Sequence, residues 1–203
     1  MLVKICGLTS REDAELAIAA GADLVGFIFV PGTPRELEPG GVGWIRDVAG
    51  AETVGVFRDA HLETISDLRN LLRLDWIQLH GDEPDTYLDA LGPRVIRRVR
   101  PGGGGGWNEV RRLGDRCLPL LDPGAGSGEA WGWDTMERPP DGLRFGLAGG
   151  LGPRNVADAV LRLRPALVDV SSGVESERGK KARNLVESFI SSARMAAGQG
   201  GGE

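Results

Sequence analysis

A thiol and a carboxyl group each end a strand-like apolar run, and both are candidates for acid–base chemistry. Cys6 ends the run Leu2–Cys6 just before an expected helix start, where backbone N–H groups and the helix dipole favour a thiolate. Lys4 lies on the same face of this run and adds a cation. Asp122 closes the run Cys117–Leu121. Cys6 therefore predicts a reactive thiolate and Asp122 a general acid, the alternatives being a buried apolar cysteine and an aspartate that caps a turn.

Glycines and hydroxyl groups follow the last two apolar runs and predict a site for an anion. Gly149 and Gly150 come after the seventh run, and Ser171, Ser172 and Gly173 come after the eighth. Exposed N–H groups and hydroxyls at this place often bind phosphate in barrels of parallel strands. The sequence therefore predicts a small phosphorylated ligand, the alternative being two tight turns without a ligand.

Three more polar residues at the ends of apolar runs are candidates for substrate binding. Gln78 and His80 share one face by alternation, and a single histidine without a recognisable partner predicts binding rather than proton transfer. Asp169 is expected either to hold a sugar hydroxyl or to cap a turn. Cys117 begins its run, away from these groups, and is expected to be a buried apolar side chain.

Eight short β-rich runs alternate with helix-like stretches and must position these groups. The runs are Leu2–Cys6, Leu24–Val30, Thr53–Phe57, Trp76–Leu79, Val95–Val99, Cys117–Leu121, Leu143–Leu147 and Ala166–Val170. Thr9 and Glu12 have the spacing of a capping box, and Gly152-Pro153 places a proline where a helix would begin. Eight such units predict an α/β fold, a single-domain (β/α)8 TIM barrel, with a doubly wound open sheet as the alternative.

Composition sets limits on domains and partners. The 203 residues, 41% of them hydrophobic, suffice for one core, predicted over residues 1–197, with a flexible tail at 198–203 and a flexible glycine-rich loop at 101–106. A net charge of −5 without a long basic tract argues against nucleic acid and anionic membranes as partners. Without a long apolar run or a signal peptide, the protein is expected in the cytoplasm. The two cysteines form neither a metal-binding spacing nor a disulfide framework.

Six segments, in order along residues 2 to about 190, resemble those of phosphoribosylanthranilate isomerases. They are Lys4-Ile5-Cys6-Gly7-Leu8-Thr9; Gly21-Ala22-Asp23 with Val25-Gly26-Phe27; Gln78-Leu79-His80-Gly81; Leu120-Leu121-Asp122 with Gly126-Ser127-Gly128; Leu147-Ala148-Gly149-Gly150-Leu151; and Val168-Asp169-Val170-Ser171-Ser172-Gly173-Val174-Glu175. The resemblance implies a barrel enzyme that isomerises a phosphorylated sugar in tryptophan biosynthesis, without a metal or an organic cofactor.

The implied reaction is an Amadori rearrangement of N-(5-phosphoribosyl)anthranilate to 1-(2-carboxyphenylamino)-1-deoxyribulose 5-phosphate. The resemblance puts the general base on Cys6, the general acid on Asp122, and Arg35 opposite the anthranilate carboxylate, a planar anion that suits a guanidinium fork. A histidine-pathway isomerase, alone or bifunctional, would carry Asp at position 6, and a non-catalytic phosphate-binding barrel would lack Cys6 or Asp122. The oligomeric state, monomer or homodimer, stays open.

Overall fold

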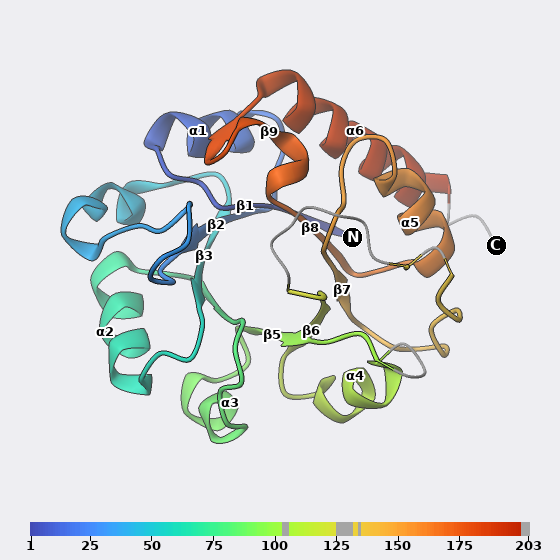
Figure 1. The fold of residues 1–203 in the computed structure, drawn as a ribbon, viewed down its shortest axis with the longest axis horizontal. Coiled ribbons are helices and arrows are strands. Elements are labelled where there is room, and N and C mark those ends of the chain that lie inside the picture. Colours follow the sequence, from blue (N-terminus) through green and yellow to red (C-terminus); the bar gives the residue numbers. More distant parts are fainter. Residues whose placement is uncertain (103–105, 125–131, 134, 200–203) are drawn as a thin grey trace.

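The eight apolar runs form the eight strands of a closed parallel barrel (Figure 1). The computed structural model describes residues 1–102, 106–124, 132–133 and 135–199. The strands are β1 Leu2–Cys6, β2 Leu24–Ile28, β3 Glu52–Phe57, β4 Trp76–Leu79, β5 Val95–Val99, β6 Leu118–Leu121, β7 Gly146–Leu147 and β8 Leu167–Val170. Each strand pairs with its neighbour in the chain, and β8 pairs with β1. The predicted barrel is therefore confirmed and the open sheet is wrong.

Helices surround the barrel and cover the outward faces of its strands (Figure 1). They are α1 Arg11–Ala19, α2 Leu62–Leu72, α3 Thr86–Leu91, α4 Trp107–Leu113, α5 Val156–Leu163 and α6 Arg183–Gln199. Between β2 and β3, two short 3-10 segments, Pro39–Gly41 and Gly43–Asp47, take the place of a helix. After β8 the chain forms a further 3-10 turn, Ser172–Val174, and a small antiparallel hairpin, β9 Glu175–Glu177 with β10 Lys180–Lys181, which the sequence did not predict.

Two apolar layers hold this arrangement together. The larger one fills the space between strands and helices. The smaller one consists of Leu24, Val54, Ile96, Leu118, Leu120, Ala148 and Leu167, which form a separate cluster. Strand register pairs Leu24 with Lys4, and Lys4 with Asp169, so these side chains share the interior face of the barrel. The barrel interior therefore holds buried polar side chains next to apolar ones.

The first helix begins one residue later than the capping-box spacing indicates. Ser10, not Thr9, is the N-cap of α1, and its hydroxyl accepts the N–H of Asp13 at 3.1 Å. The Thr9 hydroxyl instead donates to the carbonyl of Gly179 at 2.8 Å and fastens the hairpin to the loop after β1. The prediction that Thr9 and Glu12 form a capping box is wrong because Thr9 is used in this long-range contact.

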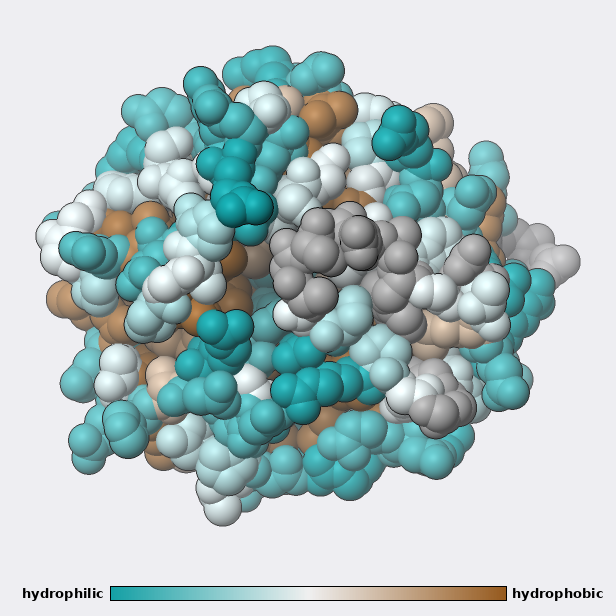
Figure 2. All heavy atoms as spheres, in the orientation of Figure 1, coloured by the Kyte–Doolittle hydropathy of each residue, from teal (hydrophilic) through white to brown (hydrophobic). Residues whose placement is uncertain are grey.

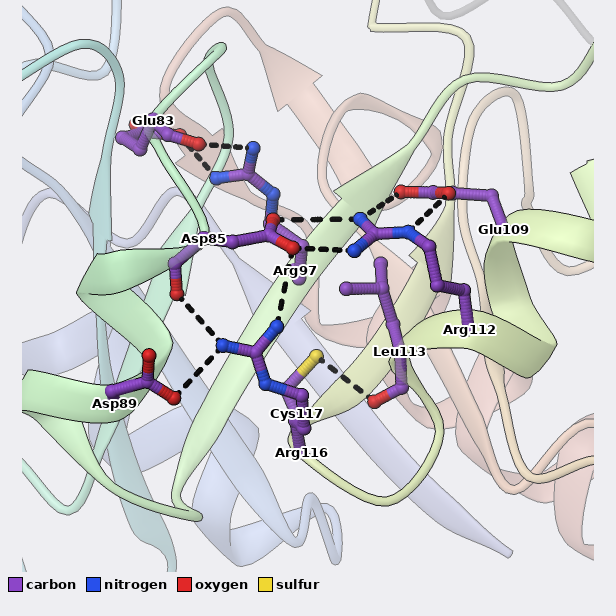
Figure 3. Close-up of polar contacts among 9 residues, drawn as sticks. All are labelled: Glu83, Asp85, Asp89, Arg97, Glu109, Arg112, Leu113, Arg116 and Cys117. Atoms are coloured by element: carbon purple, nitrogen blue, oxygen red, sulfur yellow. Dashed lines mark hydrogen bonds and ion pairs between the residues drawn. The ribbon is translucent and has the colours of Figure 1, made fainter.

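Ion pairs link the outer surfaces of α3 and α4 (Figure 3). Asp85 accepts hydrogen bonds from Arg112 and Arg116, Arg116 also reaches Asp89 at 2.8 Å, and Arg112 grips both oxygens of Glu109. We call these five residues the outer ion-pair cluster. Because these side chains are partly or largely exposed, water screens each pair, and the pairs add little to the stability of the fold. Hydrophilic side chains also cover most of the face in Figure 2.

The two segments predicted to be flexible are only partly described. Helix α6 continues through Gln199, so Gly198 and Gln199 belong to the helix rather than to the predicted tail, and residues 200–203 lie outside the described part. In the glycine-rich loop, residues 103–105 are also outside it, and Gly106 caps α4 with a φ of +78°. Among the described helices, none is long and apolar enough to cross a membrane. The cytoplasmic location and the lack of nucleic-acid partners stay predictions.

We expect Ser10→Ala to lower the free energy of unfolding by about 1 kcal/mol, because α1 loses the side chain that accepts an N–H of its first turn. Urea unfolding followed by circular dichroism measures this change. Ser191→Ala is the control, since Ser191 lies exposed within α6 and caps no helix. Equal midpoints for Ser10→Ala and the parent protein would contradict the assignment of the cap.

Candidate functional site

The carboxyl ends of the strands surround a cavity of about 670 Å³. Ten of the eleven residues singled out in the sequence line it: Cys6, Arg35, Gln78, His80, Asp122, Gly149, Gly150, Asp169, Ser171 and Ser172. Gly173 lies behind this lining, where a Cβ atom would collide with the carbonyl of Leu151. The fold thus brings together residues that lie between Cys6, at the end of β1, and Ser172, in the turn after β8.

A buried ion pair lies beneath Cys6. Nζ of Lys4 is 2.8 Å from Oδ2 of Asp169, and the Lys4 side chain is fully buried. Cys6 lies over Gly26, where a Cβ atom would be only 2.8 Å from the Cys6 sulfur and 3.1 Å from Cε of Lys4. A glycine at this position therefore makes room for the thiol and the lysine to lie side by side.

The pKa of Cys6 is raised, contrary to the expectation of a lowered value. Burial is the main cause, and Asp169 acts in the same direction, while the Lys4 ammonium lowers the pKa. The expected lowering rested on the Lys4 ammonium and the nearby helix start. Burial of Cys6 removes water from the sulfur, and this loss of water disfavours a thiolate. In addition, α1 begins only at Arg11, five residues beyond Cys6. Without a ligand, Cys6 therefore favours the neutral thiol.

Asp122 occupies a different environment on β6's carboxyl side. Burial raises the pKa of its carboxyl group, outweighing the N–H of Gly124, which donates to Oδ1 at 2.7 Å, and the charge of Arg98. Oδ2 lies 3.8 Å from Nε2 of His80. A carboxyl group whose pKa is raised holds its proton closer to neutrality, which suits proton donation.

His80 is neutral near pH 7. Burial lowers its pKa to about 4, and the charges of Arg98 and Lys4 act in the same direction. Nε2 of Gln78 lies 3.0 Å from Nδ1 of His80. The neutral ring therefore shares a hydrogen bond with Gln78 through Nδ1 and presents its Nε2 side to Asp122.

Sequence reasoning missed Arg98, which ties two strand ends together. Its guanidinium donates to the carbonyls of His80 at 3.3 Å, Asp122 at 3.1 Å and Pro123 at 2.6 Å. Gly124 is required beside it, since a Cβ atom there would collide with the guanidinium. Arg98 thus fixes the backbone that carries the histidine and the carboxyl group. The two adjacent arginines inside β5, Arg97 and Arg98, were the available signal.

Three buried polar atoms at the cavity have no hydrogen-bond partner among the described residues. They are Oε1 of Gln78, Oδ1 of Asp169 and Oγ of Ser171. All three belong to residues that line the cavity. Buried acceptors without partners cost about 1 to 3 kcal/mol each, so they favour a ligand that brings hydroxyl or N–H donors. A sugar has such donors.

The loops after β7 and β8 offer backbone donors. Gly149 and Gly150 have φ angles of +85° and +69°, a conformation that glycine adopts readily. Asn155 holds this loop, accepting the N–H of Gly152 at 2.8 Å and donating to the carbonyl of Gly150 at 2.9 Å. Asn155, not Pro153, immediately precedes α5, so the predicted helix start at Pro153 is wrong.

The N–H groups of these loops are free to bind an anion. Within the described part of the chain, no hydrogen bond is donated by the backbone N–H groups of Gly149, Gly150, Ser172 or Gly173. Grouped N–H donors of this kind bind phosphate.

Arg35 does not stand alone, because an acid from the hairpin binds it. Nε and Nη2 of Arg35 donate to the two carboxylate oxygens of Glu175 at 2.6 and 2.7 Å, and Nζ of Lys181 reaches the same carboxylate at 2.9 Å. Burial by itself raises the pKa of Glu175, but these two cations outweigh it and lower the pKa to about 2. Glu175 was not predicted as a site residue because its partner Arg35 is 140 positions away, and Lys181 was not predicted because it belongs to the unpredicted hairpin.

Cys117 lies at the opposite end of the barrel wall, as expected. It precedes β6, is buried, and its sulfur donates weakly to the carbonyl of Leu113 at 3.7 Å (Figure 3). Burial raises the pKa of this thiol to about 11. The segment Gly126-Ser127-Gly128 lies outside the described residues. Among those described, no group of three His, Cys, Asp or Glu side chains is arranged to hold a metal ion.

A family model, curated proteins and solved structures that are similar to this chain carry the name of the same kind of enzyme. Residues 3–192 match the family model for N-(5'-phosphoribosyl)anthranilate isomerases. The isomerase of that name from Geobacter sulfurreducens is 40% identical over 200 residues, covering 95% of this chain and 98% of the relative. The crystal structure of the Thermotoga maritima enzyme has a TM-score of 0.83 at 34% identity and covers 96% of this chain and 99% of that one.

A further crystal structure of such an isomerase contains a bound compound. It is a complex with reduced 1-(o-carboxyphenylamino)-1-deoxyribulose 5-phosphate. Its TM-score is 0.80 at 34% identity, and the match covers 96% of this chain and all of that one.

We expect His80 to stay neutral down to about pH 4. In His61→Gln, His80 is the only imidazole, and its NMR shifts should titrate with a midpoint near the pKa of about 4 rather than the ordinary 6.5. Since the unfolded chain takes up this proton at higher pH than the folded one, the free energy of unfolding should fall as pH drops from 6.5 towards 4. A midpoint near 6.5 would contradict burial as the controlling influence, and His80→Gln should remove this part of the pH dependence.

Proposed function

The chain belongs to the N-(5'-phosphoribosyl)anthranilate isomerase family, isomerases of tryptophan biosynthesis, and on that premise we propose that it converts N-(5-phosphoribosyl)anthranilate to 1-(2-carboxyphenylamino)-1-deoxyribulose 5-phosphate by general acid–base catalysis. The observation that carries this proposal is the shared cavity of Cys6 and Asp122, one thiol and one carboxyl group in separate environments. An aldose-to-ketose rearrangement needs one proton donor and one proton acceptor.

The substrate has two anionic ends, and the cavity has a different site for each. The phosphate binds the backbone N–H groups of Gly149, Gly150 and Gly173 and the hydroxyl of Ser172. The positive φ angles of Gly149 and Gly150 make the turn after β7 tight. The anthranilate carboxylate binds Arg35. When both anionic ends of the substrate are bound in this way, its ribose lies between Cys6 and Asp122.

The ribose hydroxyls bind the buried acceptors. Oδ1 of Asp169 and Oε1 of Gln78 have no partner among the described residues, and each accepts a hydrogen bond from a hydroxyl of the sugar. Oγ of Ser171 is a third such atom. These contacts hold the sugar over the Cys6 sulfur and position C2 for proton removal.

Asp122 opens the ring. Its protonated carboxyl gives a proton to the furanose ring oxygen while the C1–O bond breaks, and the nitrogen lone pair forms the C1=N bond of an iminium ion. The former ring oxygen becomes the 4-hydroxyl. Burial of Asp122 supports this role because it raises the pKa of the carboxyl group.

Cys6 then removes the proton from C2. The electrons of the C–H bond form C1=C2, those of C1=N return to nitrogen, and the resulting enolamine tautomerises to the ketone. The thiolate is required for this step, although burial disfavours it. Two changes on binding favour it: hydroxyl groups neutralise part of the Asp169 charge, which leaves Lys4 more effective, and the iminium ion adds a positive charge next to the sulfur.

We expect Cys6→Ser and Asp122→Asn each to lower kcat by about 10²- to 10⁴-fold, the contribution of one general acid or base. The substrate is made in situ from anthranilate and phosphoribosyl pyrophosphate with the transferase, and the loss of its fluorescence is followed. Binding of the reduced product analogue should change only a few-fold in both variants. Cys117→Ser is the matched control and should keep its kcat, because this thiol lies away from the cavity. A Cys6→Ser enzyme with normal kcat would disprove the base.

We also expect Ser172→Ala to raise KM by about 10-fold or more, the loss of one hydrogen bond to a charged group, with kcat little changed. Its dissociation constant for inorganic phosphate, measured by calorimetry, should rise in parallel. Ser191→Ala on α6 serves as the control for a serine removed elsewhere. Unchanged KM and phosphate binding in Ser172→Ala would remove the phosphate from this loop.

A further inference from the structure

The guanidinium of Arg35 is gripped by only one of its two planar edges. The edge made by Nε and Nη2 donates to the two oxygens of Glu175. A guanidinium has five N–H donors, and this contact uses two. Nη1, with two N–H groups, and the second N–H of Nη2 form the other edge, and no described residue accepts from them. Arg35 therefore keeps a complete fork for another planar anion.

The charges around this arginine also leave room for one anion. Arg35 and Lys181 both contact Glu175, so two positive charges surround one negative charge. The side chain of Arg35 is 13% exposed, that of Lys181 is 0% exposed and that of Glu175 is 5% exposed, so water screens these charges little. The remaining charge of +1 matches a single carboxylate. Glu175 thus neutralises part of the site without cancelling its attraction for an anion.

Several contacts make Glu175 a rigid support. It opens β9, whose partner strand β10 carries Lys181. The N–H of Lys181 donates to Asp13 on α1 at 3.0 Å, and its Nζ donates to the carbonyl of Ser171 at 3.1 Å. The arginine passes over Gly7, where a Cβ atom would collide with its Cδ. Arg35 is therefore confined between a glycine on one side and an anchored carboxylate on the other.

We propose that Glu175 is a positioning residue, which holds the Nε–Nη2 edge of Arg35 so that the Nη1–Nη2 edge faces the carboxylate of the substrate. This inference rests on the proposed function, since it concerns the same Arg35 site. Fixing the guanidinium before binding removes the cost of ordering a long side chain when the carboxylate arrives. Glu175 acts through Arg35 and does not itself touch the substrate.

If Glu175 instead competed with the substrate carboxylate for Arg35, its removal would have the opposite effect on binding. If the substrate carboxylate needed the Nε–Nη2 edge, Glu175 would have to be displaced, and its removal would tighten binding. If Glu175 only stabilised the hairpin, its removal would weaken all ligands alike. If Glu175 positions Arg35, its removal lowers the affinity for ligands that carry the carboxylate and leaves the affinity for ligands without it unchanged.

Glu175→Gln tests this directly, because it keeps the size of the side chain and removes its charge. Two probes are used: the reduced product analogue, 1-(o-carboxyphenylamino)-1-deoxyribulose 5-phosphate in reduced form, and the same compound without the carboxyl group. Calorimetry gives both dissociation constants. Glu109→Gln is the matched control, because Glu109 binds Nε and Nη2 of Arg112 in the same two-point manner on the outer surface (Figure 3).

We expect Glu175→Gln to raise the dissociation constant of the carboxylated probe by about 10-fold, because ordering a free arginine side chain on binding carries a cost of about this size. The dissociation constant of the other probe should change by less than about twofold. KM should rise while kcat stays within a few-fold, and Glu175→Asp should restore part of the loss. Glu109→Gln should change the dissociation constant of neither probe. Tighter binding, equal weakening of both probes, or no change in Glu175→Gln would each overturn the proposal.

The parent protein and Arg35→Ala separate this result from failure of the proposed function. If the parent neither turns over the substrate nor binds the carboxylated probe, the proposed function is wrong. If Arg35→Ala weakens both probes equally, Arg35 does not bind the carboxylate. With both of these satisfied, the response of Glu175→Gln reports on positioning alone.

Discussion

The buried ion pair between Lys4 and Asp169 is the constraint on which the rest of the site depends. It joins the first strand to the last, at the register position where β1 and β8 close the barrel. A fully buried ammonium is stable only with a partner, and removing one member of such a pair typically costs about 3 to 5 kcal/mol. The pair therefore fixes the two strands relative to each other. It also fixes where the charge next to Cys6 and the free oxygen of Asp169 lie.

Burial acts on the acid and the base in the same direction, with opposite consequences. It raises the pKa values of both Asp122 and Cys6. For the carboxyl group this retains the proton that it is proposed to give, whereas for the thiol it opposes the ionised form. The cation of Lys4 lies beside the thiol, and neutral His80 lies beside the carboxyl group. Cations oppose burial in both places, Lys4 at the thiol and Arg98 with Lys4 at the carboxyl group, and burial outweighs them at each.

The sequence predicted what depends on local pattern, namely the eight strands, their order and the groups at their carboxyl ends. Alternation places Lys4 and Cys6 on one face whatever surrounds them. It does not measure how completely the barrel excludes water, so the direction of the Cys6 pKa was wrong. Partners far apart in the chain were also out of reach, as Arg35 and Glu175 are separated by 140 positions. Arg98 was missed because its acceptors are backbone carbonyls, which no residue type marks.

The difference between the two anion sites determines the orientation of the proposed substrate. The loops after β7 and β8 offer backbone N–H groups around positive-φ glycines, a compact cradle that fits tetrahedral phosphate oxygens. Arg35 offers a flat fork, which fits a planar carboxylate better than a phosphate cradle does. A substrate bound the other way round would place each anion against the wrong geometry. Because Asp122 and Cys6 are proposed to act on two atoms bonded to C1 of one sugar, the ring oxygen and C2, this discrimination decides which of those atoms each group meets.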